Sequence, residues 1–419
     1  MRALATSHGL LVATVALVAA RVSAQQPAPQ AEDSFPGVAQ QVSVGQQIEE
    51  IQSSQGISSP DLIGPLTNLG LILREQGDLD LAVAAFERAR HVVRVNYGLS
   101  SFKEAPLLRQ LVQIEEAKGN AAAAWDLEQE LIGLLRGSPG PGAAPMLREI
   151  ADKRVDVLER YSAGEFPPQI ELGCYYTEPA RRNYAELDLK GNGSCRSGSS
   201  YRVKAALLDE ARSYYVDTIQ MVLLSEGPSA AELPEFYMGW VRAIYAAAND
   251  FTTEYDGRGI LRDLHSLAVK NSEPLPVQMN ALVRIADWDL LFAGGRKKNE
   301  AALQAYEALY GRLEQEGLAQ SLIDEMFSPS VPVVLPSFSP NRLASIETPD
   351  SQGFIDAAFE ITKYGEGKSI EILDTSTNTT EAARARLREI IKWGRFRPRV
   401  ANGAFEDPSR VVVRYYVSD

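Results

Sequence analysis

Residues of the kinds that perform covalent or metal chemistry are few in this chain and widely separated. Its histidines are His8, His91 and His265, and none has another His or a Cys at a spacing suited to one metal ion. The patterns His-Glu-x-x-His, Gly-x-Ser-x-Gly, the phosphate-binding loop and Gly-x-Gly-x-x-Gly are absent. We therefore expect no bound metal, no cofactor and no catalytic residues.

Two polar stretches match catalytic patterns in form only. Ser100-Ser-Phe-Lys103 has the Ser-x-x-Lys order of penicillin-binding enzymes, but the Ser-Asp-Asn and Lys-Thr-Gly partners of that site are missing. The stretch Asp287-Trp288-Asp289 is equally compatible with a groove and with packing. An enzyme whose site is assembled from dispersed residues stays open as an alternative. It predicts a deep pocket lined by titratable groups with shifted pKa values.

The first 24 residues have the composition of a secretory signal peptide. Arg2 supplies a positive charge, residues 9–20 are apolar, and Val22-Ser23-Ala24 is a small-residue cleavage site before Gln25. The alternative is an uncleaved anchor, but a membrane-spanning helix needs about 20 apolar residues and this run is shorter. No cysteine stands directly after the run, at the cleavage site, which argues against a lipid anchor. We predict a periplasmic protein with no membrane span after cleavage.

The charge balance is acidic throughout. The chain has 42 basic and 55 acidic residues, and loss of two arginines with the signal would change the net charge from −13 to −15. Nonspecific binding to nucleic acid or anionic lipid requires clustered Lys and Arg. The composition therefore predicts protein or peptide partners and no nucleic acid.

Cys174 and Cys195 are the only cysteines. A redox-active pair typically has Cys-x-x-Cys spacing, whereas twenty residues separate these two. In an oxidising compartment an isolated pair is expected to form one disulfide. Closing a loop of this size contributes about 3 kcal/mol. We predict a structural disulfide.

After a Gln-, Pro- and Ser-rich stretch at 25–60, expected to be a flexible leader, residues 61–325 show helical periodicity. Two similar segments lie at about 63–96 and 105–138. In the first, apolar or small residues on two successive helices flank a Gly77-Asp78 turn: Leu66, Leu69, Gly70 and Leu73, then Ala82, Phe86 and Ala89. Gly70 and the two alanines would let the helices approach closely while Phe86 fills the gap between them.

The second segment repeats this pattern 42 residues further on, with Gly119-Asn120 at the turn and Glu128 in place of Phe86. The two copies resemble tetratricopeptide repeats, whose usual period is about 34 residues. The resemblance implies a solenoid of helical hairpins. Further helices are expected near Ala144–Tyr161, Tyr201–Leu224, Glu232–Ala248, Ile260–Lys270, Val277–Phe292 and Glu300–Glu316. An ordinary irregular helical domain is the alternative.

Four prolines then predict an extended connector at 326–347 that lies against the helices. Residues 348–419 follow a ββαβ pattern, with strands at Phe354–Thr362, Ser369–Leu373 and Arg410–Val417 and a helix ending at Trp393. Its glycine-containing hairpin turn, the run Arg395-Phe396-Arg397-Pro398, the Asn402-Gly403 turn and the Val-rich last strand resemble the C-terminal domain of TonB energy transducers. The sequence predicts a mainly α fold: a helical-hairpin solenoid followed by a small α+β domain.

The TonB resemblance implies docking through an exposed strand edge, since TonB meets outer-membrane receptors in that way. We expect Phe396 to pack the helix end onto the sheet, and Arg395 and Arg397 to point outward. The residues nominated for this surface are Arg395, Phe396, Arg397, Arg410 and Arg414. The residues nominated on the inner helices of the two repeats are Thr67, Leu71, Arg74, Arg109 and Gln113.

Together these patterns favour a non-enzymatic periplasmic adaptor or scaffold that binds proteins or peptides through the helices and docks through the TonB-like domain. The first alternative is a component of TonB-dependent transport that contacts outer-membrane receptors. A merely solvated inner face is the alternative for the helical residues.

Overall fold

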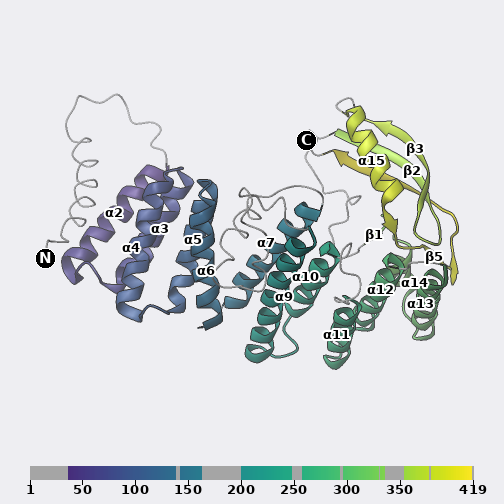
Figure 1. Cartoon of the computed structure of the whole chain (residues 1–419), viewed down its shortest axis with the longest axis horizontal. Coiled ribbons are helices and arrows are strands. Elements are labelled where there is room, and N and C mark those ends of the chain that lie inside the picture. The colour runs from purple at the N-terminus through teal and green to yellow at the C-terminus, as the bar shows by residue number, and fades with distance from the viewer. Residues whose placement is uncertain are drawn as a thin grey trace. The chain divides into compact units, whose positions relative to one another are not determined.

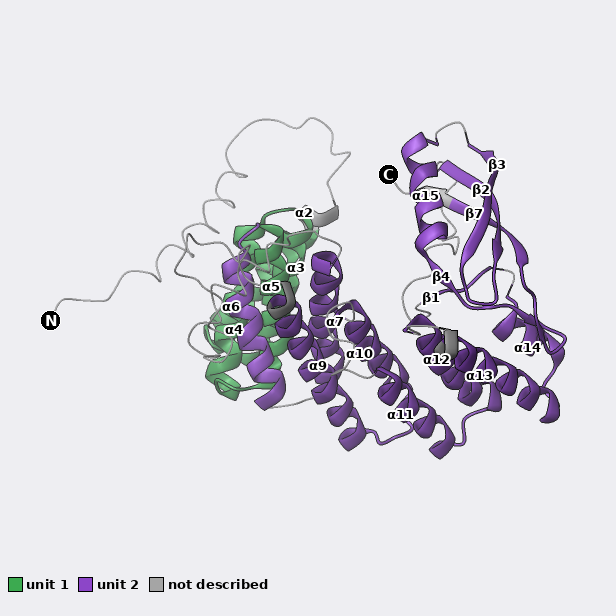
Figure 2. Cartoon of the chain, turned by 45° about the vertical axis from the view of Figure 1, so that its right-hand side comes forward, with its two compact units in different colours: residues 1–118 green, residues 119–419 purple. Residues whose placement is uncertain are grey.

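The computed structural model describes residues 36–137, 142–162, 200–247, 257–292, 296–329, 331–335, 353–376 and 379–417. The described part is mainly α-helical and ends in a small strand-containing region, as expected (Figure 1). It divides into two compact units, one ending at Lys118 and the other beginning at Gly119 (Figure 2). The predicted signal peptide and the Cys174–Cys195 disulfide lie outside the described residues. No described helix is long and apolar enough to cross a membrane.

The first unit consists of helices α2 (Pro36–Gln55), α3 (Ile63–Glu75), α4 (Leu79–Tyr97) and α5 (Ala105–Ala117), with short 3-10 turns before α3 and α5. The flexible leader predicted for residues 25–60 is wrong from Pro36 onward, because α2 is a regular helix that packs against α3. Its apolar stripe is sparse: Ile48 is buried, and Val44 and Ile51 are partly buried. Only three apolar positions mark this face, which makes the helical period hard to recognise in the sequence.

The α3–α4 hairpin is built as the sequence predicts. Gly77 has a φ of +83° and makes the turn, and Asp78 occupies the N-cap position of α4. Phe86 is fully buried, and a Cβ placed on Gly70 would lie 2.7–2.9 Å from three carbons of its ring. Such distances are far inside van der Waals contact, so only glycine lets α3 approach this ring closely.

Replacing Gly70 with alanine is therefore expected to destabilise the protein, although alanine is the better helix former. Because Phe86 is enclosed on all sides, overpacking should cost about 1–3 kcal/mol. Gly64→Ala is the matched control, since no atom lies within 4 Å of a Cβ there. This control should be stabilising by up to about 1 kcal/mol. Chemical denaturation of both variants checks the prediction, and equal effects would contradict it.

The second unit contains α6 (Ala121–Gly137), α7 (Ala143–Ser162), α9 (Ser200–Ser225), α10 (Leu233–Ala247), α11 (Gly257–Lys270), α12 (Leu275–Leu291), α13 (Arg296–Gln315) and α14 (Gln320–Phe327). The expected helices are present with ends shifted by a few residues, and α14 is additional. Close glycine–aromatic contacts recur between consecutive helices. A Cβ on Gly239 would lie 2.5 Å from the Tyr215 ring, and one on Gly257 would lie 2.5 Å from the Trp288 ring.

Helices α6, α7 and α9 enclose a buried charged cluster. Arg154 on α7 binds Glu128 on α6 and, at 3.0 Å, Glu210 on α9, and all three side chains are buried. The Arg154 guanidinium also lies 4.9 Å from the centre of the Trp125 ring. Burial lowers the pKa of Arg154, but the charges of Glu128 and Glu210 outweigh burial and raise it. Glu128, at the position equivalent to Phe86, thus holds neighbouring helices together by charge.

The C-terminal region contains a three-stranded antiparallel sheet of order β3-β2-β7, with β2 at Gly353–Ile361, β3 at Gly367–Thr375 and β7 at Ser409–Val417. Helix α15 (Glu381–Trp393) covers one face, and Thr380 caps it by accepting a hydrogen bond from the Ala383 N–H. A short hairpin, β5 (Val400–Ala401) and β6 (Ala404–Phe405), turns at Asn402-Gly403 as predicted; both turn residues have positive φ. The ββαβ order predicted from the sequence is present.

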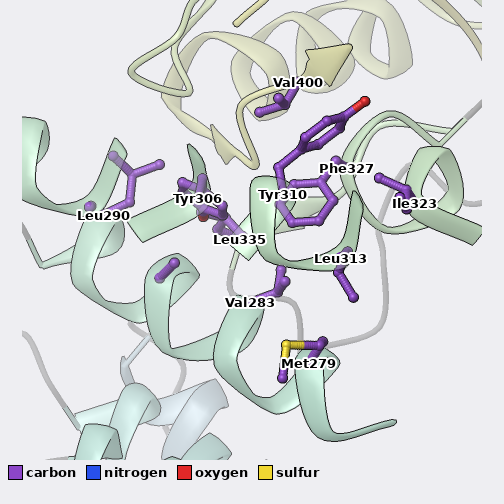
Figure 3. Close-up of a cluster of buried hydrophobic side chains, with 12 residues drawn as sticks. Met279, Val283, Leu290, Tyr306, Tyr310, Leu313, Ile323, Phe327, Leu335 and Val400 are labelled. Carbon is purple, nitrogen blue, oxygen red and sulfur yellow. The ribbon is translucent and has the colours of Figure 1, made fainter. Parts of the chain in front are cut away.

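The proline-rich connector is extended at its described end and takes part in pairing. β1 (Val334–Leu335) pairs antiparallel with β4 (Arg395–Phe396). Leu335 and Val400 enter a buried cluster formed mainly by α12, α13 and α14, where Val400 lies above Tyr310 and Phe327 (Figure 3). The α+β region therefore packs directly on helices α12, α13 and α14.

Candidate protein-binding surfaces

Helices α3 and α5 bring two of the nominated residues together. The Arg74 guanidinium donates hydrogen bonds to the side-chain oxygens of Gln113, at 3.1 Å, and Gln110. All three side chains are partly buried. Arg74 and Gln113 are 39 positions apart, so this contact joins one face of α3 to one face of α5.

The remaining nominated residues on these helices are Thr67, Leu71 and Arg109. Thr67 is partly buried and its hydroxyl donates to the Ile63 carbonyl at 2.7 Å, so it stabilises α3. Leu71 and Arg109 are partly buried on α3 and α5. We name Arg74, Gln110 and Gln113 the amide–arginine group. Gln110 was not nominated from the sequence, although it directly follows Arg109.

The chemistry of the amide–arginine group suits polar peptide recognition. Both partners of Arg74 described above are neutral amides, so its positive charge is not cancelled within the group. Each glutamine has a side-chain N–H₂ that can donate to a backbone carbonyl. Arginine forms charge-assisted hydrogen bonds with carboxylates and carbonyl groups. The group thus presents donors to a partner and is partly preorganised by its internal hydrogen bonds.

The second candidate surface is the outer edge of β7. β7 pairs with β2 on one side, and within the described residues no strand pairs with its other side. Val412 is 59% exposed on this strand. An unpaired strand edge offers backbone donors and acceptors to an incoming strand. The edge predicted at Arg410–Val417 is therefore present in the fold.

The nominated arginines of β7 are exposed but paired. Arg414 makes two hydrogen bonds of 2.8 Å to Asp356 on β2, and its guanidinium lies 4.2 Å from the centre of the Phe354 ring. The hydrogen bonds from Arg414 lower the pKa of the Asp356 carboxyl. Arg410 binds Glu371 on β3 at 2.9 Å. Both arginines lie on the face of the sheet opposite α15.

The other three nominated residues are turned inward. Phe396 is fully buried and packs on Phe359 with ring centres 5.2 Å apart, so it closes the core between sheet and helix as expected. Arg395 is partly buried and donates to the Tyr364 carbonyl at 2.8 Å. The expected outward orientation of Arg397 is wrong, because this side chain is only 8% exposed and binds Asp287 on α12.

Asp287 is the residue that sequence reasoning left undecided. It is 3% exposed and accepts hydrogen bonds from Arg397 and, at 2.6 Å, from the Tyr306 hydroxyl on α13. Burial and the Asp287 charge raise the pKa of Tyr306 well above its usual value, so this hydroxyl keeps its proton and remains a donor. The sequence feature that could have indicated a buried role for Asp287 is its position between Ala286 and Trp288, both buried, on an apolar helix face.

The Ser-x-x-Lys stretch and His265 have the following surroundings. The Ser101 hydroxyl accepts from the Lys103 N–H, and the Lys103 ammonium lies 3.5 Å from the centre of the Tyr97 ring. His265 is partly buried, and burial together with Arg312 lowers its pKa. Within the described ranges, no three His, Cys, Asp or Glu side chains are placed to hold a metal ion.

A comparison with protein-family models gives no match for this chain, and a comparison with curated protein sequences gives none either.

Proposed function

We propose that this chain is an exported, non-enzymatic adaptor that binds a protein or peptide segment through the inner face of its first helical hairpins. The observation that carries this proposal is the amide–arginine group of Arg74, Gln110 and Gln113. It places donors from two successive inner helices on one face, with no carboxylate in the group to cancel the charge of Arg74. A partner segment rich in carbonyl or carboxylate acceptors fits this chemistry.

The repeated architecture supports the same proposal. The close glycine–aromatic contacts at Gly70, Gly239 and Gly257 each join two consecutive helices. A recurring hairpin contact of this kind is what a tetratricopeptide-like solenoid would show, with degenerate repeats in the middle of the chain. Such solenoids present their inner helices along an extended concave surface, which suits binding of protein segments.

The second candidate function is a part in TonB-dependent transport. The observation that favours it is the edge of β7, with which no second strand pairs among the described residues, on a ββαβ region that resembles the TonB C-terminal domain. In this alternative the partner adds a strand along β7. The two proposals differ in the surface used and in the class of partner captured.

The test is crosslinking capture from the native periplasmic fraction with the full chain, followed by affinity measurements on each purified partner. Arg74→Ala combined with Gln113→Ala should weaken binding at least about tenfold, because hydrogen bonds that involve a charged group contribute about 1.5–3 kcal/mol. Arg262→Ala removes the same charge from an exposed position on α11 and should have no effect. Val412→Asp places a charge on the edge of β7 without touching the helices.

The results separate the proposals. Loss of binding in the Arg74/Gln113 variant alone supports the adaptor. Loss in Val412→Asp alone, with outer-membrane receptors as the captured partners, would replace the adaptor with the transport component. Binding that neither change affects would contradict both surfaces.

A further inference from the structure

Residues 395–400 form an arginine-bearing segment that packs against helices α12, α13 and α14. The Arg397 side chain reaches Asp287 on α12 with an Nε–Oδ1 distance of 2.9 Å and an Nη2–Oδ2 distance of 2.5 Å. Its remaining Nη1 donates to the Met326 carbonyl at 2.9 Å. A planar guanidinium that meets a carboxylate in this two-point geometry fixes orientation as well as distance.

The end of α14 supplies further acceptors to the same segment. Arg399 donates to the carbonyls of Pro329, at 2.6 Å, and Ser328, at 3.3 Å. In return the Ser328 hydroxyl donates to the Val400 carbonyl at 2.7 Å. Carbonyls at the C-terminal end of a helix lack partners within the helix and carry partial negative charge, so cations are favourable there.

A buried apolar cluster lies next to these polar contacts. Val400 is fully buried with Tyr310 and Phe327, and Leu335 from the connector joins the same cluster (Figure 3). Undocking the α+β region would expose this cluster and separate Asp287 from Arg397. Breaking a buried ion pair is strongly unfavourable. Separation of the two parts is therefore linked to disruption of α12–α14.

We propose that the Asp287–Arg397 pair is a latch that makes helices α12–α14 and the α+β region one cooperative unit. The α+β region is then held in a fixed orientation on these helices and does not swing on the proline-rich connector. Arg397 and Asp287 act as positioning residues for β7, whichever partner the protein binds. This inference does not depend on the proposed function.

Hydrogen exchange with mass spectrometry on the full chain tests the latch. Arg397→Met should speed exchange in peptides of α13 (Arg296–Gln315) and of β2 (Gly353–Ile361) together, by at least about 100-fold. Arg414→Met is the matched control, because it removes an arginine from an exposed ion pair in the same region. That control should leave α13 unchanged. Arg397→Lys retains the charge without the two-point contact and should give an intermediate effect.

Faster exchange in β2 while α13 keeps its protection would overturn the proposal, and so would a change confined to residues 395–401. A measurement on the unmodified chain in low urea covers the case in which Arg397→Met does not fold. A common opening of α13 and β2 with the same urea dependence supports the latch. Separate openings with different urea dependences contradict it.

Discussion

Replacing Arg154 with methionine is expected to lower the free energy of unfolding by about 3–5 kcal/mol, because two buried carboxylates would lose their common partner. Glu128 and Glu210 come from different helices, and Arg154 between them is 3% exposed. Methionine preserves most of the side-chain volume, so the loss reports mainly on charge. Urea denaturation followed by circular dichroism measures the effect.

Two further variants make this prediction specific. Arg148→Met removes an arginine from the same helix α7, but its partner Glu235 is exposed, so the loss should be at most about 1 kcal/mol. Combining Arg154→Met with Glu128→Leu and Glu210→Leu should recover much of the stability, since a buried ionic cluster can often be exchanged for apolar packing. A triple variant as unstable as Arg154→Met would show that the ionic cluster is not the cause.

The second large effect is expected at Phe396. Its ring is fully buried between the sheet and α15, so Phe396→Ala should destabilise the protein by about 3–5 kcal/mol through lost burial and a cavity. Trp393 lies three positions earlier and is 77% exposed. Trp393→Ala should therefore change stability by less than about 0.5 kcal/mol.

The comparison of these two aromatic residues separates a structural role from a binding role. Thermal denaturation of each variant gives stability, and the capture experiment gives binding. Phe396→Ala is expected to have a lower melting temperature. Any loss of binding in this variant should result from unfolding. A stable Phe396→Ala variant that fails to bind would restore Phe396 as a contact residue and contradict its assignment to the core.

Local patterns in the sequence predicted the helices and strands well. The 3.6-residue period located α7 and α9 to α13, and the Gly70–Phe86 contact followed from residue size and spacing alone. The Asn402-Gly403 turn was expected from the resemblance, and this pair has positive φ at both positions, as a two-residue hairpin turn requires. In each case the signal lies within one hairpin, where neighbouring residues determine the structure.

Contacts between distant segments were the part that could not be predicted. Arg397 and Asp287 are 110 positions apart, and no periodicity links them. Arg397 was expected to be exposed because arginine usually is, and only a buried acid on another element reverses that preference. Two members of the amide–arginine group, Arg74 and Gln113, were nominated from the sequence, and Gln110 was not. The repeat alignment predicts which helix faces meet, but it does not predict which side chains on those faces form hydrogen bonds.

The two ion pairs on the open face of the sheet restrict how any partner can approach it. Arg410 and Glu371 lie on the outer strands β7 and β3, so their contact crosses the middle strand, and Arg414 with Asp356 adds a second pair on the same face. A flat partner laid over this face would have to strip water from four charged groups without offering better partners. The face therefore resists stacking against a second sheet, and access is left to the edge of β7, where only backbone groups need new partners.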